Sequence, residues 1–211
     1  MDSDLLADRF IHWCRACHSP QAEARQLWSD LSALYQESHR HYHTLTHIAA
    51  SLAELDATGK GTPELEGAIW FHDVIYDPTR GDNEDASIEW FENATVPWLA
   101  PETRTAITRL IAATDFRRPR NDDPAEALMV DIDLAILSVE WPLYDAYRRS
   151  VRREYAHVPD EAFRAGRAKV MASFLAAPVY RTPHFTQRES RARENIAREI
   201  AELGSDRPIV T

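Results

Sequence analysis

The stretch AIWFHDVIYDP, residues 68–78, interrupts an apolar run with a histidine and an aspartate, His72 and Asp73. Apolar residues flank this doublet on both sides, with the letters WF before it and VI after it. A charged pair inside an apolar segment is costly to bury unless a cation or several hydrogen-bond donors compensate it. The spacing of the apolar residues predicts a helix over 63–75 that carries the doublet into the core.

Two other apolar segments contain side chains of metal-ligating types. The stretch SHRHYHTLTH, residues 38–47, contains four histidines, of which His43 and His47 are one helical turn apart. The stretch MVDIDLAIL places Asp131 and Asp133 in a strongly apolar helix, and no lysine lies near any of the three segments. A divalent metal ion is the economical way to satisfy two histidines and two carboxylates from three apolar segments.

Apolar residues recur at intervals of three and four along nearly the whole chain of 211 residues. This spacing indicates helices, and no convincing run of alternating polar and apolar residues indicates a strand. The connecting polar stretches are short enough for a single compact bundle. The sequence therefore predicts an all-α protein, a compact multi-helix bundle in one domain over 1–211. Its expected helices include 21–37, 44–57, 63–75, 84–92, 124–137, 141–156, 160–176 and 186–203.

The charge balance restricts the classes of partner. Acidic residues outnumber basic residues by 34 to 24, which gives a net charge of −10 with neutral histidine. Binders of nucleic-acid polymers and anionic membranes depend on excess positive charge, so we expect neither class here. A small phosphorylated ligand is compatible with the net negative charge, because a bound metal ion or a local arginine cluster overrides the electrostatic field of the whole protein. The N-terminus has no signal-peptide pattern and no long apolar run occurs, so we expect a cytoplasmic protein.

The segment Cys14-Arg15-Ala16-Cys17-His18 has the spacing of a c-type haem attachment site. Haem attachment normally follows export, and this chain shows no export signal. The surrounding apolar residues also have helical spacing, and cysteine packs well as a small core residue. We therefore expect no haem, and we interpret Cys14 and Cys17 as buried structural thiols rather than a redox or zinc pair.

The ordered set of His47, the His72–Asp73 doublet and a later aspartate resembles the HD superfamily of metal-dependent phosphohydrolases. The closest likeness is to a bacterial subgroup described as predicted HD-superfamily phosphohydrolases. The resemblance implies an all-helical bundle of HD type, with a metal-binding core at about 40–140 and C-terminal helices at about 141–204 packed on it. The segments that carry it are RHYHTLTHI, WFHDVIYDP, DNEDAS, VDIDLAIL, VRREYAHVPDEAFRAGR and the tail from Tyr180 to Glu199.

The resemblance also implies a set of metal ligands. His43 is the rival of His47 for the first position. Asp131 is the alternative to Asp133, and it is otherwise an acceptor for a ligating imidazole. Mixed nitrogen and oxygen ligands leave Mn, Fe, Co, Ni, Zn and Mg open as the metal. The expected ligands are His47, His72, Asp73 and Asp133.

Two departures from the family pattern restrict the reactions that we expect. No histidine occurs between His72 and His157, which disfavours the di-iron site of HD oxygenases. Asp115, in AATDF, lies where a ligand for a second hard cation would fall. The chain also lacks the GYP-like motif of the cyclic-nucleotide branch, so we do not expect hydrolysis of cyclic dinucleotides.

Together these features imply an enzyme that hydrolyses a small phosphorylated metabolite, such as a nucleotide, by attack of a metal-activated water on phosphorus. Glu84 and Asp77, which follow the doublet, are the candidates for general acid or base. The competing interpretation of both is capping of the helix that begins near Asp82. Two other functions stay open, a non-catalytic nucleotide sensor and an HD-fold oxygenase or lyase.

Arginine side chains are the expected phosphate ligands, because the guanidinium group offers several directed donors. Arg40 and His43 lie beside the first predicted ligand. Arg148 and Arg152 are one helical turn apart and are expected to hold one anion between them. The sequence is compatible with a homodimer.

Overall fold

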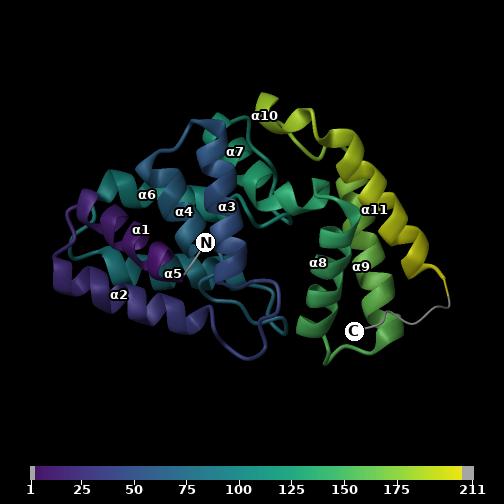
Figure 1. The fold of residues 1–211 in the computed structure, drawn as a ribbon, viewed down its shortest axis with the longest axis horizontal. Helices are drawn as coiled ribbons and strands as arrows, with labels where there is room; N and C mark the ends of the chain where they lie inside the picture. The colour runs from purple at the N-terminus through teal and green to yellow at the C-terminus, as the bar shows by residue number, and fades with distance from the viewer. Residues whose placement is uncertain (1–2, 206–211) are drawn as a thin grey trace. The chain divides into compact units, whose positions relative to one another are not determined.

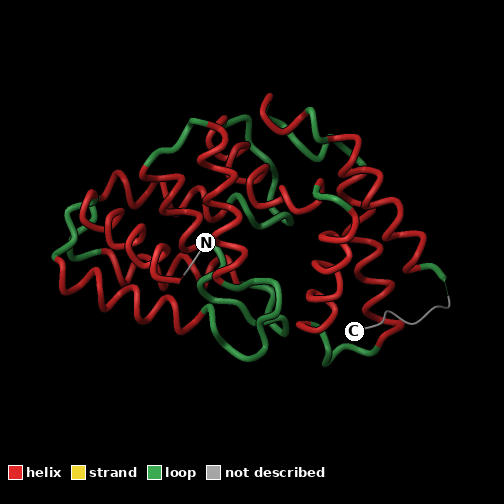
Figure 2. Tube along the Cα trace, viewed as in Figure 1, coloured by secondary structure: helices red, strands yellow, loops and turns green. Residues whose placement is uncertain are grey.

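The structure, a computed structural model, describes residues 3–205. Within that range every regular element is a helix and no strand occurs, which confirms the predicted all-α fold (Figure 2). None of these helices combines the length and hydrophobicity that a membrane crossing requires. In chain order the elements are α1 (Ser3–Ala16), α2 (Gln21–Leu34), α3 (Leu45–Thr58), α4 (Pro63–Phe71), α5 (Asn83–Thr95), α6 (Pro101–Ala112), α7 (Pro124–Asp133), η1 (Leu134–Ser138), α8 (Trp141–Glu154), α9 (Asp160–Leu175), α10 (Pro183–Thr186) and α11 (Glu189–Leu203).

The chain divides into two compact units, Met1–Val130 and Asp131–Thr211, and the border falls inside α7. In the first unit α4 is the central helix, with α1, α3, α5 and α6 against it (Figure 1). Its residues from Gly67 to Phe71 are all buried, as expected for a helix that is apolar on every side. Because the doublet follows Phe71 directly, this packing places His72 in the interior of the unit.

Gly67 allows two neighbouring helices to approach α4 closely. A Cβ atom at this position would lie 2.6 Å from Cδ1 of Ile107 and 2.8 Å from Cζ2 of Trp13. Ile107 and Trp13 are themselves fully or nearly fully buried, so neither side chain has free space to move into. The absence of a side chain at Gly67 is therefore a packing requirement of the first unit.

We expect Gly67→Ala to lower the free energy of unfolding by about 1–3 kcal/mol, because overpacking outweighs the gain in helix propensity. Gly166→Ala is the matched control, since Gly166 also lies inside a helix but has open space where the Cβ would stand. The control should gain up to about 1 kcal/mol from helix propensity. Urea unfolding followed by circular dichroism measures both, and an unchanged midpoint for Gly67→Ala would contradict the packing argument.

Helix α4 ends at Phe71, whereas the sequence predicts a helix to Ile75. The backbone N–H of Ile75 donates to Oγ of Ser87, at 3.1 Å, instead of to a carbonyl one turn earlier in the chain. The Ser87 hydroxyl in turn donates to the carbonyl of Ile75. A side chain from α5 thus satisfies the backbone groups that continued helix would have used, and the doublet stands at a helix end.

The second unit contains η1 and the helices α8, α9, α10 and α11, with α11 against α9 and η1 (Figure 1). The expected helix over 124–137 tightens into the 3₁₀ helix η1 after Asp133. Two carbonyls of η1 accept hydrogen bonds from distant side chains, Leu134 from Tyr180 and Leu137 from Asn195. These contacts explain the tighter geometry, because they occupy groups that an α-helix would pair internally.

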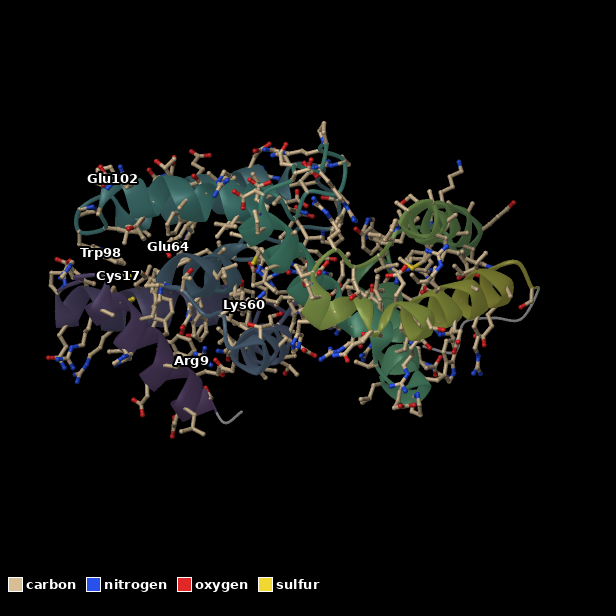
Figure 3. All side chains as sticks on the ribbon, turned by 90° about the horizontal axis from the view of Figure 1, so that it is seen from above. Arg9, Cys17, Lys60, Glu64, Trp98 and Glu102 are labelled. Atoms are coloured by element: carbon tan, nitrogen blue, oxygen red, sulfur yellow. The ribbon has the colours of Figure 1, made fainter. Side chains whose placement is uncertain are left out.

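Both cysteines are buried, as the sequence predicts, with 0% of Cys14 and 8% of Cys17 exposed. Burial raises the pKa of Cys14 to about 12 and that of Cys17 to about 11. The negative charge of Glu64 raises the pKa of Cys17 further. Figure 3 labels Glu64 and Cys17. Because the thiolate is the reactive form, these thiols are poor nucleophiles at neutral pH.

Candidate metal centre

Two buried histidines of the first unit face each other. His47 lies in the first turn of α3, which begins after the cap formed by Thr44, and His72 follows α4. Only 4% of His47 and 2% of His72 is exposed. Their Nε2 atoms are 3.0 Å apart. Two nitrogens that each lie about 2.0–2.1 Å from one ion are separated by about 3 Å, so this spacing fits two ligands of a single metal ion.

The hydrogen bonds of His72 assign its tautomer. Its Nδ1 lies 3.0 Å from the carbonyl oxygen of Ile69, and a carbonyl can only accept, so Nδ1 carries a proton. In neutral His72 the Nε2 atom is then left with its lone pair, in the form that a metal ion requires. The carbonyl of Ile69 also fixes the orientation of the ring, as the outer partners of metal-binding histidines commonly do.

The Asp73 carboxylate lies beside both imidazoles. Its Oδ2 is 3.2 Å from Nε2 of His72 and 3.6 Å from Nε2 of His47. Burial by itself would raise the pKa of Asp73, but the imidazoles of His72, His43 and His47 hold it well below its usual range. The carboxylate is therefore ionised, and it contributes negative charge to a largely buried cluster.

Asp133 is the last residue of α7 and is half-buried. One ligand atom from each of His47, His72 and Asp133 lies within 4.8 Å of the others, so these groups could hold a metal ion. Asp131 is fully buried, and its carboxylate accepts hydrogen bonds from the backbone N–H groups of Arg181 and Thr182. These contacts favour Asp133 over Asp131 as the ligand and give Asp131 a structural role.

His43 stands in an aromatic group near the two buried histidines. Its ring stacks on Tyr76 with centroids 4.1 Å apart, and its centroid lies 6.0 Å from that of His47. Tyr42 packs against both histidine rings. His43 is half-buried, whereas His47 is buried, which favours His47 as the ligand and His43 as a neighbour at the more open side.

Arg40, expected to bind phosphate, instead bonds to the backbone around the doublet. Its side chain is fully buried, with Nη1 at 2.7 Å from the carbonyl oxygen of Asp73 and Nη2 at 2.9 Å from that of Val74. Nη1 also donates to the carbonyl of His43, at 3.2 Å. Arg40 thus joins the two histidine-bearing segments, and its donors in the described chain serve backbone carbonyls and Glu37.

Two residues near the start of α5 hold the loop that follows the doublet. The side chain of Asn83 pairs with both the N–H and the carbonyl of Asp77, and Ser87 pairs in the same way with Ile75. The sequence analysis assigned no role to these two residues. Their spacing of four in DNEDAS, which puts two small polar side chains on one helix face, is the signal that could have indicated them.

Glu84 lies between these two residues and is half-buried, with 26% of its side chain exposed. Burial raises its pKa, and the negative charges of Asp115 and Asp73 add to the rise. Nη2 of Arg117 lies 3.2 Å from Oε2 of Glu84 and also pairs with Asp115. Burial and neighbouring carboxylates raise the pKa of Glu84 in this way, and a raised carboxyl pKa is a common property of general acids and bases.

Asp115 was expected near a second metal ion, and Asp77 was expected to act on the substrate. Both carboxylates bond instead to other residues of the protein. The Asp115 carboxylate accepts from Arg117 at 2.7 Å and from Arg118 at 3.1 Å, and the bond from Arg117 lowers its pKa. Asp77 accepts from the hydroxyl and the N–H of Thr79, which lowers its pKa as well. The Thr79 contacts hold Asp77 in a local turn of the loop and not in a cap of α5, which has no side-chain cap at Asp82 either. The arginine contacts make Asp115 an anchor for Arg117 and Arg118.

The predicted anion clamp on α8 is paired with other residues of the second unit. Nη2 of Arg148 lies 2.5 Å from carboxylate oxygens of both Asp145 and Glu202. Arg152 donates to the carbonyls of Tyr155 and Val158. An anion bound here would face two carboxylates at Arg148, so this pair stays a prediction that the observed contacts do not favour.

No family model, no curated protein and no solved structure matches this chain. The resemblance to the HD superfamily therefore rests on the ordered motifs, from RHYHTLTHI to VDIDLAIL, and on the site described above. The all-helical fold is in keeping with that family and is shared with many others, so the site must carry the functional argument.

Proposed function

We propose that this protein is a metal-dependent phosphohydrolase of HD type, which acts on a small phosphorylated metabolite such as a nucleotide. One observation carries the proposal. The Nε2 atoms of His47 and His72 face each other at 3.0 Å in the core of a helical unit, beside the ionised carboxylate of Asp73.

The residues fit a divalent ion chemically. Burial of two imidazoles and a carboxylate is costly unless a cation is bound there, and no lysine or arginine pairs with the Asp73 carboxylate among the described residues. His47, His72, Asp73 and Asp133 would supply two nitrogens and two carboxylates. Such an ion polarises a phosphoryl oxygen and lowers the pKa of a coordinated water.

The other groups of the site have separate roles in this proposal. Glu84 holds the proton that moves between water and the leaving group, because its raised pKa keeps the carboxyl nearer to neutrality than an ordinary glutamate. Arg117 positions Glu84 through the contact at Nη2. His43, whose ring stacks on the buried Tyr76, supplies an aromatic contact for the organic part of the substrate.

A phosphate-release assay tests the proposal. The full chain is loaded with Mn²⁺, Co²⁺ or Zn²⁺ and offered nucleoside mono-, di- and triphosphates and sugar phosphates, with and without chelator. We expect release of phosphate or pyrophosphate from at least one class, and loss of that activity with chelator. Full metal occupancy without cleavage of any compound, together with stabilisation by a nucleotide, would contradict hydrolysis and favour a sensing module.

A further inference from the structure

Arg40 is a buried cation of the first unit that joins two segments of the chain. Its side chain is 0% exposed, and Nε donates to Oε2 of Glu37, at 3.1 Å. Nη1 donates to the carbonyl oxygens of His43 and Asp73, and Nη2 donates to that of Val74. Arginine is almost never fully buried in proteins, and here the backbone accepts most of its hydrogen bonds.

Two aromatic rings hold the guanidinium in place. Cζ of Arg40 lies over the ring of Tyr35, 5.0 Å from its centroid, and over the ring of Tyr76, at 5.6 Å. Both tyrosines are buried, and the hydroxyl of Tyr35 donates to the carbonyl of Trp70 in α4. Cation–π contacts of this kind attract the charge and restrict rotation of the planar group. The donors of Arg40 therefore have fixed directions, which the protein itself sets.

On one side Arg40 holds the segment that carries the doublet. Asp73 and Val74 lie past the end of α4, so this helix supplies no N–H groups for their carbonyls. Nη1 donates to the first carbonyl at 2.7 Å and Nη2 to the second at 2.9 Å, within the range of well-formed hydrogen bonds. Loss of these donors would leave two backbone acceptors of a largely buried segment unpaired. The position of the Asp73 carboxylate therefore depends on Arg40.

On the other side Arg40 holds the segment that leads into α3. Nη1 also donates to the carbonyl of His43, at 3.2 Å, one residue before the cap of α3 at Thr44. His47 lies in the first turn of that helix, and its Nε2 is 3.0 Å from Nε2 of His72. This separation depends on how the start of α3 is placed against the doublet segment. A binding site requires its groups to be held within about 0.5 Å, and one guanidinium joins both backbones here.

We propose that Arg40 is a positioning residue of the metal centre, which raises the affinity for a divalent ion by holding the two ligand-bearing segments in register. The proposal rests on the metal centre of the proposed function and is independent of its hydrolytic step. Binding to a site of fixed geometry costs little conformational entropy, so Arg40 increases the affinity without contacting the ion. Because the charge of Arg40 repels a cation, the gain must come from geometry rather than from attraction.

Titration of the full chain with Co²⁺ tests the proposal through binding and not through turnover. We expect Arg40→Lys to lower the affinity for Co²⁺ by about 10–100-fold, the usual effect of removing a partner that orients metal ligands. Lysine keeps the charge, but its single nitrogen lacks the forked geometry that reaches the carbonyls of His43, Asp73 and Val74 together. The visible absorption of bound Co²⁺ reports the arrangement of its ligands, so the spectrum at saturation should also change.

Arg9→Lys is the matched control, because Arg9, labelled in Figure 3, also joins helices of the first unit but bonds to carboxylates. Arg9 of α1 donates to Asp56 of α3 at 2.7 Å and to Glu66 of α4 at 2.9 Å. The control should bind Co²⁺ within about twofold of the natural protein and give the natural spectrum. Circular dichroism verifies that both variants are folded. A folded Arg40→Lys protein with natural affinity and spectrum would overturn the proposal, and so would equal losses of affinity in both variants.

A measurement on the natural protein does not depend on whether Arg40→Lys folds. In protein labelled with ¹⁵N-arginine, the rings of Tyr35 and Tyr76 should displace the guanidinium N–H signals of Arg40, and burial should protect them from exchange with solvent. We expect these signals in the metal-free protein, and at nearly the same positions after addition of Zn²⁺. Signals that appear only with Zn²⁺ would show that the ion itself orders these contacts, which would overturn the proposal.

Binding and hydrolysis together distinguish the role of Arg40 from the proposed enzymatic function. Metal affinity that depends on Arg40, in a protein that cleaves no phosphate ester, would refute only the enzymatic function. Natural Co²⁺ affinity in a folded Arg40→Lys protein that still hydrolyses its substrate would refute only the role of Arg40.

Discussion

Asp73→Asn should lower the affinity of the protein for a divalent metal ion by more than about a hundredfold, because in the proposed site Asp73 is a ligand rather than a partner of one. The amide has nearly the volume of the carboxylate, so the buried cluster keeps its packing. It loses the negative charge that stands 3.2 Å from Nε2 of His72 and 3.6 Å from Nε2 of His47. Titration with Mn²⁺ or Zn²⁺, followed by elemental analysis of the dialysed protein, measures the loss.

Asp82→Asn provides the control for this experiment. Asp82 belongs to the loop that follows the doublet, but it is exposed and pairs with Arg80. The same chemical change should leave the affinity for metal within about twofold of the natural value, because an exposed ion pair contributes little. Natural affinity in Asp73→Asn would show that the doublet does not bind the ion.

Glu84→Gln should reduce kcat by about 10²–10⁴ on whichever phosphate ester the protein cleaves, the usual contribution of a positioned acid or base. The substitution keeps the shape of the side chain and removes its ability to exchange a proton. Metal content should not change, since the role proposed for Glu84 is proton transfer and Glu84 is not among the proposed ligands. Steady-state kinetics with elemental analysis on the same sample distinguish this result from simple loss of metal.

Glu89→Gln is the matched control for Glu84, because Glu89 is an exposed residue of the same helix, α5. Its kcat should equal that of the natural protein. A Glu84→Gln variant with unchanged kcat at full metal occupancy would remove Glu84 from the mechanism. The role of proton carrier would then belong to another group near Asp73.

The helices could be predicted from the sequence because their signal is local. Apolar residues three and four positions apart indicate α1 to α9 and α11. The end of α4 could not be predicted, because the hydroxyl of Ser87, twelve residues away, decides where the backbone leaves the helix. The change to η1 has the same origin, in Tyr180 and Asn195.

The site shows the same division between local and distant causes. The ligand types His47, His72 and Asp73 could be proposed from the sequence, because charged residues inside apolar segments need a partner. The choice between Asp131 and Asp133 could not be made there, since Asp131 binds the backbone of Arg181 and Thr182, about fifty residues later.

The arginines were the least predictable residues of the site. An arginine is compatible with a phosphate, a carboxylate or a row of carbonyls, and only the fold selects among them. Arg40 bonds to the carbonyls of Asp73 and Val74, and Arg148 pairs with Glu202 of α11. Arg167, which the sequence analysis did not single out, pairs with Glu199 and Tyr147 in the second unit.

The metal content of the full chain tests the central claim most directly. The protein is loaded with a divalent ion, dialysed against metal-free buffer and analysed for elements, with thermal unfolding of the same sample before and after chelation. We predict about one equivalent of metal per chain and a lower Tm after chelation, because an ion that binds only the folded state stabilises it. A protein that retains no ion, and whose Tm is the same with metal and with chelator, would contradict the account.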